Sequence, residues 1–352
     1  MSLTINKPSA NEVVESSLVR VSGTTDIAGE HTITATYATD PDSGSLADVT
    51  NKFALDASAQ GMCTDGTVFY ETNSTEIKKR NAAGTVLSSS TDMGLLWDDE
   101  ALTSCGDMFF KDGFIYLCGY KNTAGTSFVF KVNPANFTAV DKWDISSSFT
   151  NSVNVIFYHD SHWFIGEACQ GTSQTTFVKA FDDDFAFVKN SYSNTNDYGF
   201  QGGMMYQDKM ILTDHTNFYV CLYNNDQTFT DLYTVTPSPA QQVQGLTSDS
   251  TTFYYVHRNE YLKTFTLNEV YTYGAISSSG DLSTLTATAT RTGAGDFEIF
   301  LRASANNYQY LKCASGANTD EVAFNHVPQA GEKIISSQGA LMTNTNGALE
   351  TT

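Results

Sequence analysis

One short pattern occurs five times between about Gln60 and Leu267. Each copy has a few apolar residues, an aspartate with a turn residue, and then a run of aromatic and β-branched residues. The turn aspartates are spaced 47, 48, 48 and 41 residues apart, at Asp65, Asp112, Asp160, Asp208 and Asp249. A nearly constant spacing in this range is typical of propellers and other repeat arrays. Aspartate followed by Gly or Ser between two apolar runs also predicts a tight hairpin.

A second hairpin follows the first in each repeat. Its turns in the first four repeats are residues 81–84, 133–136, 182–184 and 224–226. Two hairpins make a four-stranded sheet, which is one blade of a β-propeller. The fifth repeat has no obvious fourth strand, and we expect residues 50–56, which precede the first repeat, to pair with it and close the ring. The hairpin rhythm resembles the β-propeller families with about 45 residues per blade, and that resemblance implies an architecture and not an activity.

Short alternating strands flank the repeats on both sides. Residues 1–47 contain three or four of them, which is too few for an independent sandwich, so this unit must pack on a neighbour or on another chain. Residues 270–352 contain further alternating strands with Gly and Asn turns. The predicted fold class is therefore all-β: an N-terminal β-unit (1–47), a five-bladed β-propeller (48–269) and a C-terminal β-sandwich (270–352).

The C-terminal unit resembles the small β-sandwiches that accompany propellers in phage tail and adhesin-type proteins. In that pattern an Arg-containing strand precedes a Pro…Gly segment and a final strand, and residues 300–302 and 328–335 match it. Ser336 and Ser337 stand where the pattern has an aromatic residue. The resemblance implies a structural or receptor-binding component of a tailed-phage virion.

The charge balance excludes some partners. The formal net charge is −20, so the protein repels phosphate backbones and anionic membrane surfaces, and we predict no nucleic-acid partner. No apolar run approaches the length of a membrane span, so we predict no membrane insertion. The six cysteines show no CxxC spacing, which fits synthesis in a reducing compartment. The chain opens with no secretory pattern, and we expect a virion protein assembled in the host cytoplasm.

Chemistry-bearing motifs do not stand out. The sequence contains no Gly-x-Ser-x-Gly, phosphate loop, dinucleotide motif or His-Glu-x-x-His, so we predict no catalytic residue, no metal site and no cofactor. A propeller glycosidase needs paired carboxylates near the central channel. The innermost strands carry Asp107 and otherwise mostly apolar residues, Gly and Gln, and Asp98 lies in an acidic loop segment.

Recognition by a loop face is the alternative that the residues favour. In a propeller, the loops that enter the innermost strands and those between the second and third strands gather on one face. We expect these loops to present aromatic, basic and acidic side chains for ligand binding, namely Trp97, Asp98, Tyr198, His215, His257 and Arg258. Such a surface suits sugar faces and equally suits a protein contact.

Three hypotheses follow. The first is a non-catalytic structural or receptor-binding, adhesin-like virion component that self-associates, contacts other virion proteins and recognises a host surface glycan or protein. The second is a propeller glycoside hydrolase or lyase acting on polysaccharide. The third is a cellular scaffold propeller that holds protein partners.

Overall fold

The computed structural model describes residues 2–10, 13–14, 18–38, 43–56, 58–73, 76–90, 104–120, 126–169, 173–224, 226–237, 242–249, 252–258, 260–270, 286–291, 293–302, 307–326, 333–335, 341–345 and 348–351. These residues are almost entirely β-strand, which confirms the all-β prediction. Within them, no helix has both the length and the apolar character needed to cross a membrane. The chain divides into two compact units, one of Ser43–Glu269 and one that combines Met1–Asp42 with Val270–Thr352.

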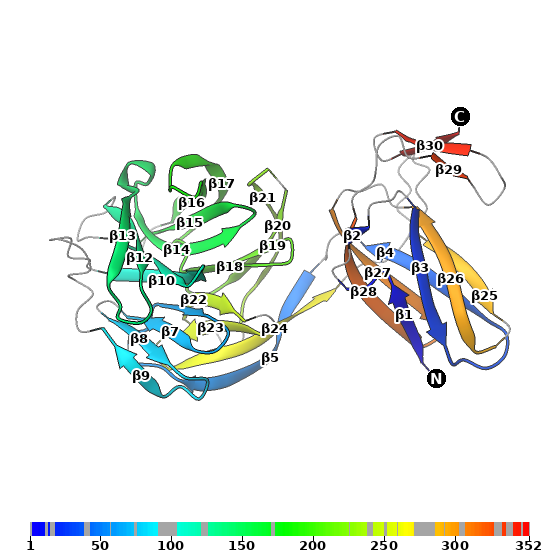
Figure 1. The fold of residues 1–352 in the computed structure, drawn as a ribbon, viewed down its shortest axis with the longest axis horizontal. Coiled ribbons are helices and arrows are strands. Elements are labelled where there is room, and N and C mark those ends of the chain that lie inside the picture. Colours follow the sequence, from blue (N-terminus) through cyan, green and yellow to red (C-terminus); the bar gives the residue numbers. More distant parts are fainter. Residues whose placement is uncertain are drawn as a thin grey trace. The chain divides into compact units, whose positions relative to one another are not determined.

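The unit Ser43–Glu269 is a β-propeller (Figure 1). Its described residues form five antiparallel four-stranded sheets, one per sequence repeat, with strand orders β6-β7-β8-β9, β10-β11-β12-β13, β14-β15-β16-β17, β18-β19-β20-β21 and β22-β23-β24-β5. The strands of the first two sheets are β6 (Gly61–Thr64), β7 (Phe69–Thr72), β8 (Ile77–Arg80), β9 (Val86–Ser89), β10 (Ser104–Lys111), β11 (Phe114–Tyr120), β12 (Ser127–Val132) and β13 (Ala139–Asp144). Those of the next two are β14 (Ser152–His159), β15 (His162–Ala168), β16 (Gln174–Phe181), β17 (Phe187–Asn196), β18 (Gly202–Tyr206), β19 (Lys209–Thr213), β20 (Phe218–Tyr223) and β21 (Phe229–Val235). The last sheet has β22 (Val243–Ser248), β23 (Phe253–His257), β24 (Tyr261–Val270) and β5 (Ser43–Ala54).

The innermost strands form a closed ring. Strands β6, β10, β14, β18 and β22 each contact the next, and β22 contacts β6. Neighbouring backbones approach so closely that a Cβ on Gly61 would lie 2.4 Å from the carbonyl oxygen of Gly106. Glycine is therefore required at this position, because any side chain would separate the first sheet from the second.

The fifth sheet is completed by a strand from before the first repeat. Strand β5 pairs with β24 as the fourth strand of that sheet, and the two lie side by side (Figure 1). Hydroxyl contacts support the pairing: Thr50 Oγ1 lies 2.6 Å from Thr264 Oγ1, and Thr266 donates to Asp48 Oδ2 at 3.0 Å. This confirms the prediction that residues 50–56 supply the missing strand and remove an open sheet edge.

The repeated aspartates shape the hairpins. Asp65 Oδ1 accepts the backbone N–H of Thr67 at 2.8 Å and of Val68 at 2.9 Å. Asp249 similarly accepts the N–H of Thr252 at 2.8 Å, and it also accepts the Tyr254 hydroxyl at 2.6 Å. Such side-chain acceptors hold a turn without a regular backbone ladder. Asp65 and Asp249 thus hold their turns by side-chain acceptance, whereas Asp112 and Asp160 occupy tight-turn positions with φ of 51° and 47°.

The other unit is built from both ends of the chain. One sheet has the order β1-β3-β26, from β1 (Leu3–Lys7), β3 (Leu18–Thr25) and β26 (Gly295–Arg302). A second has the order β2-β28-β27-β4-β25, from β2 (Val13–Val14), β28 (Asn318–His326), β27 (Asn307–Ser315), β4 (His31–Ala38) and β25 (Thr286–Arg291). The side chains buried in this unit include Val19, Val21, Ile33, Phe297 and Leu311. A small third sheet contains β29 (Lys333–Ile335), β30 (Leu341–Thr345) and β31 (Ala348–Thr351).

This arrangement differs from the three separate units drawn from the sequence. Strand β3 pairs with β26 along its whole length, from Leu18 opposite Arg302 to Thr25 opposite Gly295. The N-terminal strands thus find their neighbour in the C-terminal strands of the same chain. The shortness of residues 1–47 is therefore no longer a reason to invoke another chain, and self-association stays a prediction.

A buried ion pair joins the fourth and fifth sheets of the propeller. Lys209 Nζ in β19 lies 3.0 Å from Glu269 Oε2 in β24, and the two side chains are 1% and 9% exposed. The Tyr233 hydroxyl donates to the other Glu269 oxygen at 2.7 Å. The glutamate thus compensates a buried ammonium group and accepts a hydrogen bond from a half-buried phenol.

Removing Glu269 should therefore cost much more stability than removing a surface charge. We expect Glu269→Ala to lower the propeller's free energy of unfolding by about 3–5 kcal/mol, because the buried Lys209 ammonium loses the Glu269 counter-charge. Lys189→Ala is the matched control, since its pair with Asp226 has 35% and 61% exposed side chains and should contribute at most about 1 kcal/mol. Urea unfolding measures the stability of both variants. Equal losses of stability in the two variants would contradict the structural role of the Lys209–Glu269 pair.

Candidate functional site

A single carboxylate lies at the centre of the inner ring. Asp107 belongs to β10, and its Oδ1 accepts the backbone N–H of Met62 at 3.2 Å. Its Oδ2 accepts the N–H of Gly203 at 3.2 Å and the N–H of Leu246 at 3.3 Å. These donors belong to the first, fourth and fifth sheets. One side chain of the second sheet is thus hydrogen-bonded to three other sheets.

The surroundings of Asp107 suit a structural role. The side chain is 0% exposed. Burial raises the pKa of Asp107 well above its usual range, and backbone N–H donors, including that of Met108, lower it part of the way. A Cβ on Gly245 would lie 2.6 Å from Asp107 Oδ1, so backbone packs directly against the carboxylate. Both carboxylate oxygens accept hydrogen bonds. The Asp107 side chain and the backbone around it fill the propeller axis at this level.

Amide and aromatic side chains gather where the innermost strands begin, a region we call the entry mouth (Asn154, Tyr198, Gln201, His215 and Gln244). Asn154 Nδ2 donates to Gln201 Oε1 at 2.8 Å, and Gln201 Nε2 donates to the Tyr198 carbonyl at 2.9 Å. Gln244 Nε2 lies 3.2 Å from His215 Nε2. The rings of Tyr198 and His215 stack with centroids 4.4 Å apart and planes 9° apart. The network connects side chains of the third, fourth and fifth sheets with the loop before β18.

The residues chosen from the sequence fall into three groups. Tyr198 and His215 are in direct contact in the entry mouth. Arg258 lies close enough for its positive charge to lower the pKa of His215. His257 is engaged elsewhere, since its Nδ1 lies 2.8 Å from Glu260 Oε2. Trp97 and Asp98 lie outside the described residues.

Electrostatics keep the His215 ring neutral. Burial lowers the pKa of His215, the positive charge of Arg258 lowers it further, and Asp214 opposes both. The neutral ring leaves one nitrogen available as an acceptor for the Gln244 amide.

Sequence reasoning missed the amides of the entry mouth. Gln201 and Gln244 each precede a glycine of an innermost strand, as Gln60 does in the first repeat. That repeated Gln-Gly pair could have been recognised once the repeats were aligned. Asn154 offers no such signal, because it stands where other repeats have glycine.

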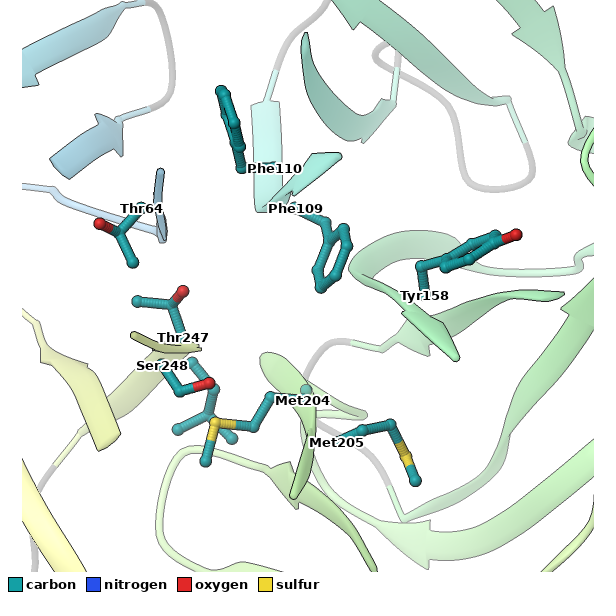
Figure 2. A pocket seen from close by; sticks show the side chains of 10 residues that line it. Thr64, Phe109, Phe110, Tyr158, Met204, Met205, Thr247 and Ser248 are labelled. Carbon is teal, nitrogen blue, oxygen red and sulfur yellow. The ribbon is translucent and has the colours of Figure 1, made fainter. Parts of the chain in front are cut away.

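A cavity lies at the other end of the innermost strands, and we call it the exit pocket (Figure 2). Its lining comes from the residues that follow Asp107 and its counterparts, such as Phe109, Met204 and Thr247. The propeller axis therefore has two distinct ends, with the buried Asp107 between them.

No protein-family model matches this sequence, and no curated protein matches it. Among solved structures, the chain is similar to the GH43_1 enzyme from Xanthomonas citri complexed with xylose, with 9% identity, a TM-score of 0.43, and coverage of 63% of this chain and 90% of that one. It is also similar to the WD40 β-propeller domain of Doa1 (9% identity, TM-score 0.38, 68% and 97% coverage). A luciferin-regenerating enzyme shows 8% identity, a TM-score of 0.39, and 75% and 87% coverage. Likenesses at this level say nothing about what the chain binds or catalyses.

Truncating Asp107 should destabilise the propeller. Asp107→Ala leaves three buried N–H groups without an acceptor, each at about 1–3 kcal/mol, so we expect a loss of at least about 3 kcal/mol in the free energy of unfolding. Asp107→Asn keeps one acceptor oxygen and should lose less. Asp184→Ala, at an exposed aspartate of the same unit, should change stability by no more than about 0.5 kcal/mol. Urea unfolding measures these changes. Wild-type stability of the Asp107→Ala variant would contradict a structural role for Asp107.

The half-buried His215 should make the propeller less stable as the pH is lowered. The folded chain binds a proton at His215 less readily than the unfolded chain, whose histidine pKa is about 6.5. Its contribution is therefore complete above about pH 6.5 and is lost as pH falls through the folded pKa. We expect the stability of the wild type relative to His215→Gln to be lower at pH 5 than at pH 7. Urea midpoints at both pH values measure this, and a pH-independent difference would contradict it.

Proposed function

We propose that this chain is a non-catalytic recognition propeller that binds a glycan at the entry mouth. The observation that carries the proposal is the Gln244 amide. Its side chain is 1% exposed, yet its Oε1 has no hydrogen-bond partner among the described residues. Buried polar groups are normally paired, so an unpaired acceptor in this mouth favours a ligand that brings a hydroxyl or an N–H.

An aromatic platform stands beside this acceptor. Tyr198 is 41% exposed, and its ring is held by the stacked His215. His215 is held in turn by Gln244. A fixed ring with few side-chain torsions offers apolar contact area at low entropic cost, and neighbouring amides supply directional hydrogen bonds. Apolar C–H faces and ring hydroxyls together are the features of a saccharide.

Arg258 adds a positive group to the same mouth. Its Nε is buried and has no hydrogen-bond partner within the described part of the chain. The Arg258 backbone N–H donates to Gln242 at 2.9 Å, which fixes the residue beside the start of β22. A guanidinium forms strong, charge-assisted hydrogen bonds with oxygen acceptors. Sugar hydroxyls, and carboxylate substituents above all, would satisfy it.

Asp107 gives little support to the alternative that the chain is a hydrolase or lyase. An acid–base or nucleophilic carboxylate must reach the substrate. Asp107 is fully buried, and both its oxygens accept backbone N–H groups. These contacts favour a structural role for this carboxylate over a catalytic one.

A binding experiment tests the proposal. We expect the fluorescently labelled full chain to bind a subset of saccharides on an array of defined glycans. Tyr198→Ala should weaken binding to those glycans at least about tenfold, which corresponds to about 1.4 kcal/mol, because the platform is lost. Arg258→Ala should weaken the binding of acidic glycans more than the binding of neutral ones.

Tyr261→Ala is the matched control, since Tyr261 is 37% exposed on β24 and lies outside the entry mouth. It should leave binding unchanged. Absence of glycan binding, or equal weakening by both tyrosine variants, would overturn the site. Shortened products released from a bound glycan by the wild type, and lost in Asp98→Ala, would show an enzyme instead.

The virion setting, contacts with other virion proteins and self-association remain predictions from the sequence. The glycan proposal does not depend on them.

A further inference from the structure

We propose that the exit pocket binds a small, uncharged aromatic molecule. This site lies at the opposite end of the axis from the entry mouth. It rests on different residues, so it goes beyond the glycan proposal and does not depend on it.

The exit pocket is assembled by the whole ring. It has a volume of about 210 Å³, and every sheet contributes to its lining, which comprises Thr64, Phe109, Phe110, Tyr158, Gly203, Met204, Met205, Leu246, Thr247 and Ser248. Figure 2 shows the two phenylalanines and the two methionines on opposite sides of the opening. Small-molecule sites are usually concave, largely preformed and lined by apolar and aromatic side chains with a few polar groups.

The inner end of the pocket is closed. Gly203 and Leu246 line it, and their backbone N–H groups donate to Asp107. The fully buried carboxylate therefore lies directly behind the pocket wall. A ligand in the pocket would therefore be stopped at the level of Asp107.

The aromatic walls are fixed in place by neighbours. Phe110 stacks on Tyr70 with planes 3° apart and centroids 5.9 Å apart. Phe109 meets the Trp163 ring edge-to-face at 6.0 Å. The Tyr158 hydroxyl donates to Asp183 at 3.0 Å. Walls held this way lose little conformational entropy when a ligand enters.

The lining chemistry specifies the ligand. Two phenylalanines and one tyrosine offer ring faces and edges, and the thioethers of Met204 and Met205 make favourable contacts with aromatic rings. None of the ten lining side chains carries a charge, so a charged ligand would lose hydration without gaining a counter-ion.

The hydroxyl groups of Thr64, Thr247 and Ser248 add polarity to one side. The side chains of Thr247 and Ser248 lie together on a different side from Tyr158 (Figure 2). They can donate to or accept from one polar group of a ring system. An indole, with one N–H on a planar apolar frame, matches this combination.

Methionine methyl groups give a direct readout of the site. The sequence has eight methionines, and two of them line the pocket. We would label the full chain with ¹³C-methyl methionine, assign Met204 and Met205 with Met204→Leu and Met205→Leu, and titrate with indole. We expect saturable ring-current shifts of these two resonances, while Met342, in the other unit, stays unmoved.

Blocking variants and charged analogues sharpen the test. Ser248→Phe fills part of the pocket and should weaken indole binding at least about tenfold. Ser193→Phe, at an exposed position of β17, should not change it. Indole-3-acetate and tryptamine should each bind at least about tenfold more weakly than indole.

Several results would overturn the proposal. They are no saturable shift of Met204 or Met205, equal shifts of all methionine resonances, equal weakening by the two serine variants, or tighter binding of a charged analogue. Because the readout is specific to this end of the axis, failure here leaves the glycan proposal untouched, and the reverse also holds.

Discussion

The hydrogen bonds of Asp107 are the interaction on which the propeller most depends. The innermost strand of each sheet is an edge, and its unpaired N–H groups face the axis. Backbones meet so closely there that nothing larger than glycine fits at Gly61 and Gly245. The Asp107 carboxylate supplies the acceptors that these buried edges lack. It thereby joins the sheets and divides the axis into two chemically different ends.

Local patterns in the sequence predicted most of the propeller. The turn aspartates and the alternation of apolar and polar residues within the strands are short-range signals. The pairing of strand β5 with the fifth sheet followed from counting four strands per repeat. Pairing between the chain's two ends was missed, because β3 and β26 are separated by more than the entire propeller and each reads as an ordinary short strand. Alternation indicates that a strand exists and not which strand it pairs with.

The sites were predictable to different degrees. Tyr198 and His215 could be selected from the sequence because aromatic and polar residues in loops of one propeller face are conspicuous, and the structure places their rings in contact. Gln244 and Asn154 were not selected, because their position next to the axis exists only in the folded ring. The exit pocket gave no signal at all. Phe109 and Met204 look like core residues in sequence, and their exposure to a cavity results from the meeting of five sheets.

The pairing of the chain's first and last segments has a mechanical consequence. The propeller is inserted, in sequence, between β4 and β25 of the sandwich unit. Tension applied through the outer segments must therefore separate two antiparallel ladders, β3 with β26 and β4 with β25, before the force is transmitted to β5 and β24. The sandwich unit thus shields the ring from load, and both ends of the propeller axis keep their geometry while the chain is pulled.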